Sequence, residues 1–363
     1  MKVAFLLGSL NRGGAETLVL DTLRKAENAP FEMILIHRKS GSMQADFYET
    51  GVKCIRCRSK ISKPFRCIIE LRRILKTECV DVIHTQQRID AFLAFFAIIG
   101  TKTKIVDTFH GFDAGYGLGS RFIVKFSGRH SDALVFVSQY EANHYISRYA
   151  IPKEKTHVVY NGIDFSKFDN VNEVPELPRH NPDSVRMAMV GNFVSERNQF
   201  DVCVFLSLIK KLNFDFYFVG GRVPGCADSY DRCVDYCIKQ GMNEMVHFLG
   251  IRNDVPSILK EMDAFIYCSH SDTFGIAVVE AIVSGIPVFV NDLPVFKEIS
   301  QHGKLAVVYQ SGNLQDLYDK FMDFLGNDMK YKNNAMENAV EVKNLYAIEQ
   351  HIINLFGLYN TLN

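Results

Sequence analysis

One stretch in the second half of this 363-residue chain constrains the fold more than any other. The apolar run 264–267 predicts a short buried strand, and the polar loop 268–275 that follows cannot join a core. Apolar residues at helical spacing then predict a helix that ends at Gly285 and Pro287. A second strand at 288–290 completes a strand, loop, helix, strand unit. This unit is the building block of a doubly wound parallel sheet.

Two carboxylates lie within this unit. Asp272 is in the loop and Glu280, eight positions later, is in the early helix. Both are expected at the carboxyl ends of the strands, where such sheets bind ligands. A purely structural interpretation is also open: Asp272 could cap the helix N-terminus, and Glu280 could be a first-turn acid that complements the helix dipole.

The start of the chain predicts a similar unit. The apolar run 2–8 is typical of a central parallel strand, and Gly13 and Gly14 then precede a helix. Such a loop can present backbone N–H groups to an anion, although a simple tight turn fits the same glycines. The pattern departs from GxGxxG, which disfavours a dinucleotide-binding dehydrogenase.

Strands and helices alternate along the rest of the chain, which predicts two α/β domains. The segment 171–183 contains three prolines and little apolar periodicity, so the domain boundary is expected near residues 165–184. A second series of strands begins at 185–190. The expected strands of the first domain after residue 8 are 32–37, 80–84, 105–109 and 133–137.

Several motifs together resemble those of a known family. The main motif begins at Asp272 and reaches Glu280 after seven intervening residues, which include Phe274 and Gly275; a small-residue helix ending in Ser-Gly-Ile-Pro follows. This motif is similar to the donor-site signature of the retaining nucleotide-sugar glycosyltransferases of family 4. The supporting motifs are GGAE after the first strand, His110 with Gly111, and NGID at 161–164. The resemblance extends over almost the whole chain.

The resemblance implies an α/β structure with the GT-B fold, in which two Rossmann-like βαβ domains face each other across a cleft. The first, acceptor-side domain would be residues 1–165 together with a terminal helix at 346–363 that crosses back onto it. Residues 166–184 would be the linker. Residues 185–345 would form the domain that binds the nucleotide-sugar donor.

The resemblance also implies roles for individual residues. Glu280 would accept hydrogen bonds from the ribose hydroxyls and Asp272 from those of the transferred sugar, and His110 would lie near that sugar. These three are the expected catalytic residues. The backbone after the strand 246–250 would recognise the base. The expected donor-binding residues, besides Glu280, are Gly13, Gly14, Asn192, Arg197, Gly250, Ile251, Arg252, Phe274, Gly275 and Ile276.

The chain departs from the family pattern at the donor diphosphate. Asn192 stands where members usually carry Arg, Arg197 where they carry Lys, and Asp272 where they carry Glu. Arg197 can still contact a phosphate in bidentate fashion and Asn192 can donate a neutral hydrogen bond. Arg222 is a second candidate for the missing charge. These departures predict a donor preference or rate unlike that of common family members.

Charge is distributed unevenly along the chain. Residues 1–165 carry a formal charge of +8 and residues 166–363 one of −8, although the chain is neutral overall. The segment 53–76 contains nine Lys or Arg against one acid, interleaved with apolar residues. Such a segment can lie on an anionic membrane surface, or it can be a solvated helix whose apolar side packs on the sheet.

Composition sets further expectations. No apolar run is long enough to span a bilayer, so the protein is expected in the cytoplasm, with peripheral contact to the inner face of the membrane. The nine cysteines lack the spacing of a zinc site and are expected to be reduced thiols. No Asp-x-Asp motif pairs at a strand end, so no catalytic metal and no cofactor are expected. The nucleotide sugar would be a substrate, and no nucleic acid partner is expected.

The expected function is therefore transfer of a sugar from a nucleotide sugar to a glycan or lipid-linked saccharide, with retention of configuration by analogy with the family. Cell-surface polysaccharide biosynthesis fits a basic first domain. Two alternatives stay open: a nucleotide-sugar 2-epimerase of the same architecture, and a non-catalytic subunit that binds a partner glycosyltransferase.

Overall fold

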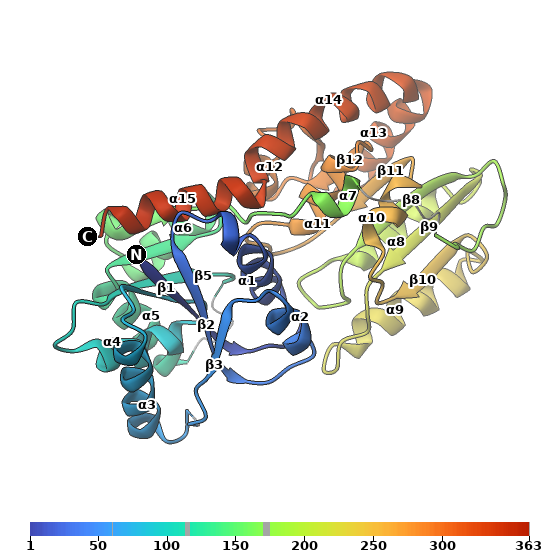
Figure 1. Ribbon diagram of the computed structural model, residues 1–363. Helices are drawn as coiled ribbons and strands as arrows, with labels where there is room; N and C mark the ends of the chain where they lie inside the picture. Colours follow the sequence, from blue (N-terminus) through green and yellow to red (C-terminus); the bar gives the residue numbers. More distant parts are fainter. Residues whose placement is uncertain (60, 113–116, 170–174, 363) are drawn as a thin grey trace. The chain divides into compact units, whose positions relative to one another are not determined.

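The computed structural model describes residues 1–59, 61–112, 117–169 and 175–362 (Figure 1). The chain divides into two compact units. Unit 1 consists of residues 1–163 and 346–363, and unit 2 of residues 164–345.

Unit 1 is built on a seven-stranded sheet in the order β3-β2-β1-β4-β5-β6-β7, and all its paired strands are parallel. The strand order reverses between β1 and β4, which places a topological switch point there. The strands are β1 (Lys2–Ser9), β2 (Glu32–Lys39), β3 (Lys53–Arg56), β4 (Val82–Thr85), β5 (Lys104–Phe109), β6 (Ala133–Phe136) and β7 (Thr156–Val158).

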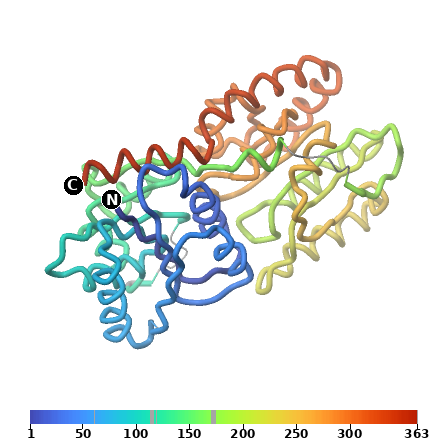
Figure 2. The backbone as a smooth tube through the Cα atoms, in the orientation of Figure 1, coloured from blue at the N-terminus to red at the C-terminus, as the bar shows by residue number. Residues whose placement is uncertain are grey.

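Helices cover both faces of this sheet because alternate residues of its apolar strands point to opposite sides. Val3 and Phe5 of β1 share one core with the C-terminal helix, whereas Ala4 and Leu6 share the other with α3 and α4. Met1 and Leu362 pack against the first core, so both ends of the chain belong to unit 1 (Figure 2). The helices are α1 (Gly14–Arg24), α2 (Gln44–Glu49), α3 (Pro64–Thr77), α4 (Arg88–Ile98), α5 (Leu118–His130), α6 (Gln139–Tyr149) and α15 (Ile348–Asn360).

Unit 2 contains a six-stranded parallel sheet in the order β10-β9-β8-β11-β12-β13, with its switch point between β8 and β11. Its strands are β8 (Val185–Val190), β9 (Phe214–Val219), β10 (Val246–Gly250), β11 (Ala264–Tyr267), β12 (Val288–Asn291) and β13 (Val307–Tyr309). Its helices are α7 (Ser166–Asp169), α8 (Gln199–Leu208), α9 (Ala227–Lys239), α10 (Val255–Lys260), α11 (Ile276–Val283), α12 (Pro294–Ile299), α13 (Leu314–Gly326) and α14 (Asp328–Tyr346).

The expected alternation of strands and helices is present, and unit 1 has two strands beyond those expected, β3 and β7. β3 begins the basic segment 53–76, where the sequence suggested only an amphipathic stretch; its four residues are an edge strand paired with β2. Part of the expected linker, 170–174, lies outside the described residues. The rest is tied to unit 2, because Tyr217 donates to the Pro178 carbonyl at 2.8 Å and the His180 amide donates to Asp215 at 2.9 Å.

Candidate active site

The switch point of unit 2 brings together two loops. The first, 191–198, follows β8, and the second, 268–275, follows the adjacent strand β11. Backbone hydrogen bonds join them: the His270 amide donates to the Glu196 carbonyl at 2.8 Å and the Asn198 amide to the Cys268 carbonyl at 3.2 Å. The two loops therefore form one continuous surface at the carboxyl edge of the sheet.

Arg197 and Asp272 meet on this surface through a third residue. The Arg197 Nε donates to the Tyr267 hydroxyl at 3.0 Å, and that hydroxyl donates to Asp272 Oδ2 at 3.3 Å. Tyr267 is the last residue of β11 and is fully buried. Burial, followed by the charge of Asp272, raises the pKa of this hydroxyl, so it keeps its proton at neutral pH.

The structure corrects the helix-cap interpretation of the two carboxylates. The N-cap of α11 is Gly275, and the Asp272 Oδ1 accepts from the amides of Thr273 at 2.8 Å and Phe274 at 3.1 Å, which shapes the loop instead. Glu280 is half-buried and lies beyond the first turn, the helix having begun at Ile276. Neither carboxylate is thus placed where a helix terminus alone would require it.

Gly275 adopts a φ of 84°, which favours glycine. A Cβ there would also lie 2.8 Å from the Phe296 ring. The loop from Asp272 therefore enters α11 only through a residue without a side chain. Phe274 is buried, whereas Ile276 is half-buried at the first position of the helix.

Asn192 is also engaged at this edge. Its Oδ1 accepts from the Gly221 amide at 2.9 Å, which ties the loop after β8 to the turn after β9. Its carbonyl accepts from Gln199 Nε2 at 3.0 Å. Arg222, the second candidate for the missing charge, forms an ion pair with Asp231 of α9. Arg197 is thus the cation that the structure places beside Asp272.

The three residues expected at the base lie at the end of β10. Gly250 has a φ of 67° and its carbonyl accepts from the Gly220 amide at 2.9 Å. Ile251 is 71% exposed. Arg252 Nε donates to Asp254 Oδ1 at 2.8 Å. The strand thus ends in a fixed turn that presents an apolar side chain to solvent.

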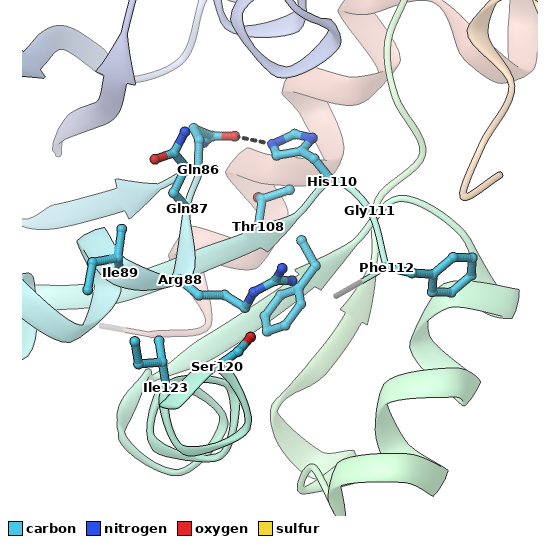
Figure 3. Close-up of a pocket in the computed structure, with 11 residues that line it drawn as sticks. Gln86, Gln87, Arg88, Ile89, Thr108, His110, Gly111, Phe112, Ser120 and Ile123 are labelled. Atoms are coloured by element: carbon cyan, nitrogen blue, oxygen red, sulfur yellow. Dashed lines mark hydrogen bonds between the residues drawn. The ribbon is translucent and has the colours of Figure 1, made fainter. Parts of the chain in front are cut away.

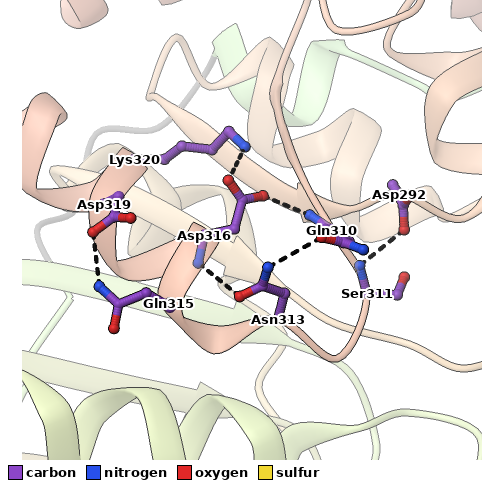
Figure 4. A network of polar contacts seen from close by, with 8 residues as sticks. All are labelled: Asp292, Gln310, Ser311, Asn313, Gln315, Asp316, Asp319 and Lys320. Atoms are coloured by element: carbon purple, nitrogen blue, oxygen red, sulfur yellow. Dashed lines mark hydrogen bonds and ion pairs between the residues drawn. The ribbon is translucent and has the colours of Figure 1, made fainter.

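A polar network lies at the ends of β12 and β13 and includes Asp292, Gln310, Ser311 and Asp316 (Figure 4). Asn291 at the end of β12 donates to the Ser269 carbonyl at 2.8 Å and to the Ser311 hydroxyl at 2.9 Å. The Ser311 amide donates to Asp292 at 2.9 Å, and the Gln310 amide donates to Asp316 at 2.7 Å. The loop that bears Asp272 is consequently fastened to two further strand ends.

His110 directly follows β5, one strand away from the switch point of unit 1. Its Nε2 lies 2.6 Å from Gln86 Oε1, at the ends of the neighbouring strands β5 and β4 (Figure 3). Because an amide oxygen only accepts, this contact assigns the proton to Nε2. Both residues line a cavity of about 510 Å³. The other lining residues are Gln87, Arg88, Ile89, Thr108, Phe109, Gly111, Phe112, Ser120 and Ile123.

Two further histidines lie near His110. His84 is buried between the Tyr359 hydroxyl and the Thr108 hydroxyl, each 2.5 Å from a ring nitrogen. His351 of α15 has its Nδ1 2.8 Å from the Tyr160 carbonyl. Burial lowers the pKa of all three: to about 3 for His110, to about 4 for His351, and well below the usual range for His84. The three rings are neutral at physiological pH.

Gly13 and Gly14 begin α1 at the same edge, after β1. Gly13 is the N-cap and Gly14 the first helical residue. The Glu16 carboxylate folds over this turn, because a Cβ on Gly13 would lie 2.5 Å from Glu16 Oε2. Burial raises the pKa of Glu16. The sequence predicts that the N–H groups of this turn bind an anion, and the structure places the Glu16 carboxylate beside them.

Two family models match the chain, each over about one of the two units. Glycosyltransferase Family 4 matches residues 12–167, and Glycosyl transferases group 1 matches residues 171–342. This chain belongs to the family 4 glycosyltransferases. The GT-B fold of this glycosyltransferase is also that of the Anabaena protein HepE, which was solved in complex with UDP. The two structures superpose with a TM-score of 0.86 at 16% identity, over 99% of this chain and 100% of HepE. A glycosyltransferase from Rickettsia africae gives a TM-score of 0.86 at 18% identity, over 99% and 98% of the two chains.

Two curated relatives of this glycosyltransferase are from Escherichia coli. The O-antigen biosynthesis glycosyltransferase WclY is 24% identical over 82% of each chain. The UDP-Gal:alpha-D-GlcNAc-diphosphoundecaprenol alpha-1,3-galactosyltransferase is 24% identical over 77% of this chain and 76% of its own length.

Three residues of the candidate site were not predicted from the sequence: Tyr267, Gln86 and His351. Tyr267 looked like an ordinary apolar member of a strand, and Gln86 was one of two adjacent glutamines. A signal existed for both, since each stands at the end of a strand next to the switch point. His351 had no such signal, because it is 241 positions from His110 and belongs to a helix that packs on unit 1 only in the folded chain.

Proposed function

We propose that this glycosyltransferase transfers a sugar from a UDP-sugar to a glycan or lipid-linked saccharide in cell-surface polysaccharide biosynthesis. The observation that carries the proposal is the joined surface at the switch point of unit 2, where Arg197 and Asp272 are held together. The HepE structures with UDP and with UDP-glucose support the donor class. The names of the two Escherichia coli relatives support the acceptor class.

On the donor side, Arg197 and the amides of residues 274–276 would stabilise the charge that grows on the departing diphosphate. Glu280 would accept from the ribose hydroxyls and Asp272 from those of the sugar. The backbone of residues 250–252 would contact the base. Because Arg197 and the amides supply the positive charge, we propose a reaction without a catalytic metal.

On the acceptor side, His110 would hydrogen-bond a hydroxyl as a neutral ring whose Nε2 proton is directed to Gln86. The configuration would be retained: the acceptor oxygen bonds to the anomeric carbon on the face from which the diphosphate leaves. The acceptor proton would pass to the departing phosphate oxygen. The cavity beside His110, with its mixed polar and apolar lining, fits a saccharide.

A donor screen tests this proposal. Thermal-shift assays with UDP-, GDP- and ADP-sugars should show stabilisation by a UDP-sugar, since ligands that bind the native state raise Tm. The stabilising donor is then incubated with and without lipid-linked acceptors. Product that forms only with an acceptor supports transfer; an altered donor sugar without acceptor would show an epimerase. Stabilisation by none of the nucleotide sugars would favour the non-catalytic subunit.

We further propose that the enzyme is cytoplasmic and contacts an anionic membrane through α3. Cys67, Leu71 and Leu75 of this helix face the sheet, but Phe65 and Ile69 are 81% and 68% exposed. The neighbouring acids are engaged: Glu70 accepts from the Arg58 and Ser59 amides at 2.8 Å each, and Glu78 pairs with Lys53 at 2.7 Å. Exposed cations of the helix are Arg66, Arg73 and Lys76. No helix in the described part of the chain is long and apolar enough to cross a membrane.

Flotation with phosphatidylcholine vesicles tests the membrane contact. Binding should require added phosphatidylglycerol and should weaken with salt, because exposed cations and apolar side chains act together. The pair Phe65→Ser and Ile69→Ser should abolish flotation. Ile353→Ser, an exposed apolar residue on α15, is the matched control and should leave it unchanged. Equal flotation with neutral vesicles, or none, would contradict the proposal.

A further inference from the structure

We propose that Tyr267 is a positioning residue that couples Arg197 to Asp272, so that the diphosphate contact and the sugar contact of the donor form together. The proposal rests on the donor site described above. It concerns the hydroxyl of a fully buried tyrosine, the last residue of β11.

The chemistry of the three groups allows one arrangement of protons. The Arg197 Nε can only donate, so the Tyr267 oxygen must accept from it across 3.0 Å. The single Tyr267 proton is then available for Asp272 Oδ2 at 3.3 Å. A cation, a neutral hydroxyl and a carboxylate thus form a directed chain in which the charge of Arg197 polarises the bond to Asp272.

The tyrosine ring is held in place from several sides. Phe265 stacks against it at a centroid distance of 6.0 Å and Phe296 meets it edge-on at 5.5 Å. The Tyr309 hydroxyl donates to the Tyr267 carbonyl at 3.1 Å, which fixes the backbone. Since the ring has 0% exposure, the hydroxyl has little freedom to swing away.

Both partners of the hydroxyl are fixed as well. The Asp272 Oδ1 is anchored by two backbone amides, so Oδ2 is directed at Tyr267. The guanidinium of Arg197 lies against Gly191, where a Cβ would come within 2.9 Å of Arg197 Nη1. A diphosphate that contacts Arg197 would therefore act on a carboxylate whose position is already set by the same network.

The network gives a physical reason for the short carboxylate. Glu at position 272 would extend the acid by one methylene, and its oxygens could not keep both the loop amides and the Tyr267 hydroxyl at these distances. Asp272→Glu should therefore impair this enzyme. The impairment should be smaller when Tyr267→Phe has already removed the hydroxyl.

The test combines Tyr267→Phe with Asp272→Asn and measures UDP affinity by calorimetry and donor kinetics with the UDP-sugar that stabilises the protein. Tyr267→Phe keeps the ring, so Tm should change little. It should weaken UDP binding by about tenfold and lower kcat by about tenfold, the usual effect of losing a hydrogen bond to a charged group. In the presence of Asp272→Asn, Tyr267→Phe should add little, because the coupling is already broken.

Tyr217→Phe is the matched control, since it removes the hydroxyl of another buried tyrosine of unit 2, one that donates to the Pro178 carbonyl at 2.8 Å. It should reduce stability without changing the ratio of kcat to KM. The coupling would be overturned if Tyr267→Phe bound UDP as tightly as the wild type, or if the losses of affinity caused by Tyr267→Phe and Asp272→Asn were additive in the double variant. A wild-type protein that binds no UDP would instead overturn the proposed donor site together with this inference.

Discussion

The carboxyl edges of the two sheets share a topology but differ in charge. Each has a switch point, between β1 and β4 in unit 1 and between β8 and β11 in unit 2. In unit 1 the edge holds neutral groups, His110 and Gln86, above the buried His84 and His351. In unit 2 it holds Arg197 and Asp272 as a bridged charge pair. The fold fixes where a ligand binds, whereas the loops decide whether the site suits a hydroxyl or a diphosphate.

The largest effect should come from removing the cation of unit 2. Arg197→Ala should lower kcat/KM for the UDP-sugar by about 10²- to 10³-fold, because the charge on the leaving diphosphate loses its main stabiliser. Steady-state kinetics measure this loss. Arg222→Ala is the control at the same edge: its side chain pairs with Asp231, so its loss should cost less than about threefold. Equal losses in the two variants would remove the distinction between them.

A smaller effect is expected at the neutral edge. Gln86→Leu removes the acceptor of the His110 Nε2 proton and should lower kcat by about 10- to 100-fold without changing UDP affinity. UDP calorimetry beside the kinetics separates the two edges. A weakened UDP affinity of Gln86→Leu would contradict the assignment of UDP binding to the edge of unit 2 alone.

Gln86→Glu sharpens the same comparison through pH. Burial, followed by the charges of His351 and Arg88, lowers the pKa of His110 to about 3. A carboxylate at position 86 would favour the imidazolium form and raise the pKa of His110. The acid limb of the pH–rate profile should therefore lie at higher pH in Gln86→Glu than in the wild type. An unchanged acid limb in the pH–rate profile would mean that His110 takes no part.

The buried histidines also predict a pH dependence of stability. Their folded pKa values lie below the unfolded value of about 6.5, so their contribution is full above that value and is lost as pH falls below it. Each should cost about 1.4 kcal/mol of unfolding free energy per pH unit. Urea unfolding at pH 7.5 and 5.5 should show a smaller decrease for His351→Gln than for the wild type. The exposed His270 is the control, and His270→Gln should behave like the wild type.

The smallest effect is expected from a chelator. With Arg197 and backbone amides as the source of positive charge, EDTA should leave the transfer rate unchanged. Loss of activity that added Mg²⁺ or Mn²⁺ restores would show that a divalent cation shares the role given to Arg197.

Much of this architecture could be predicted from the sequence, because buried parallel strands are continuous apolar runs and their ends carry glycines and polar residues. The unit from Ala264 to Asn291 is the clearest case. β3 escaped, since an edge strand of four residues with two cations has no apolar run. The sequence predicted where in the fold the site lies, but not how its side chains point, because side-chain direction depends on packing. Only the structure shows that Tyr267 lies between Arg197 and Asp272, and that Arg222 forms an ion pair with Asp231.

Hydrogen exchange with and without UDP tests the central claim most directly, namely that the charged edge of unit 2 holds the donor. UDP should slow exchange at residues 191–198 and 268–284 more than anywhere else in the chain, and this protection should disappear in Arg197→Ala. Protection that appears instead at residues 86–88 and 110–112, or no change in either unit, would contradict the assignment of the donor to unit 2.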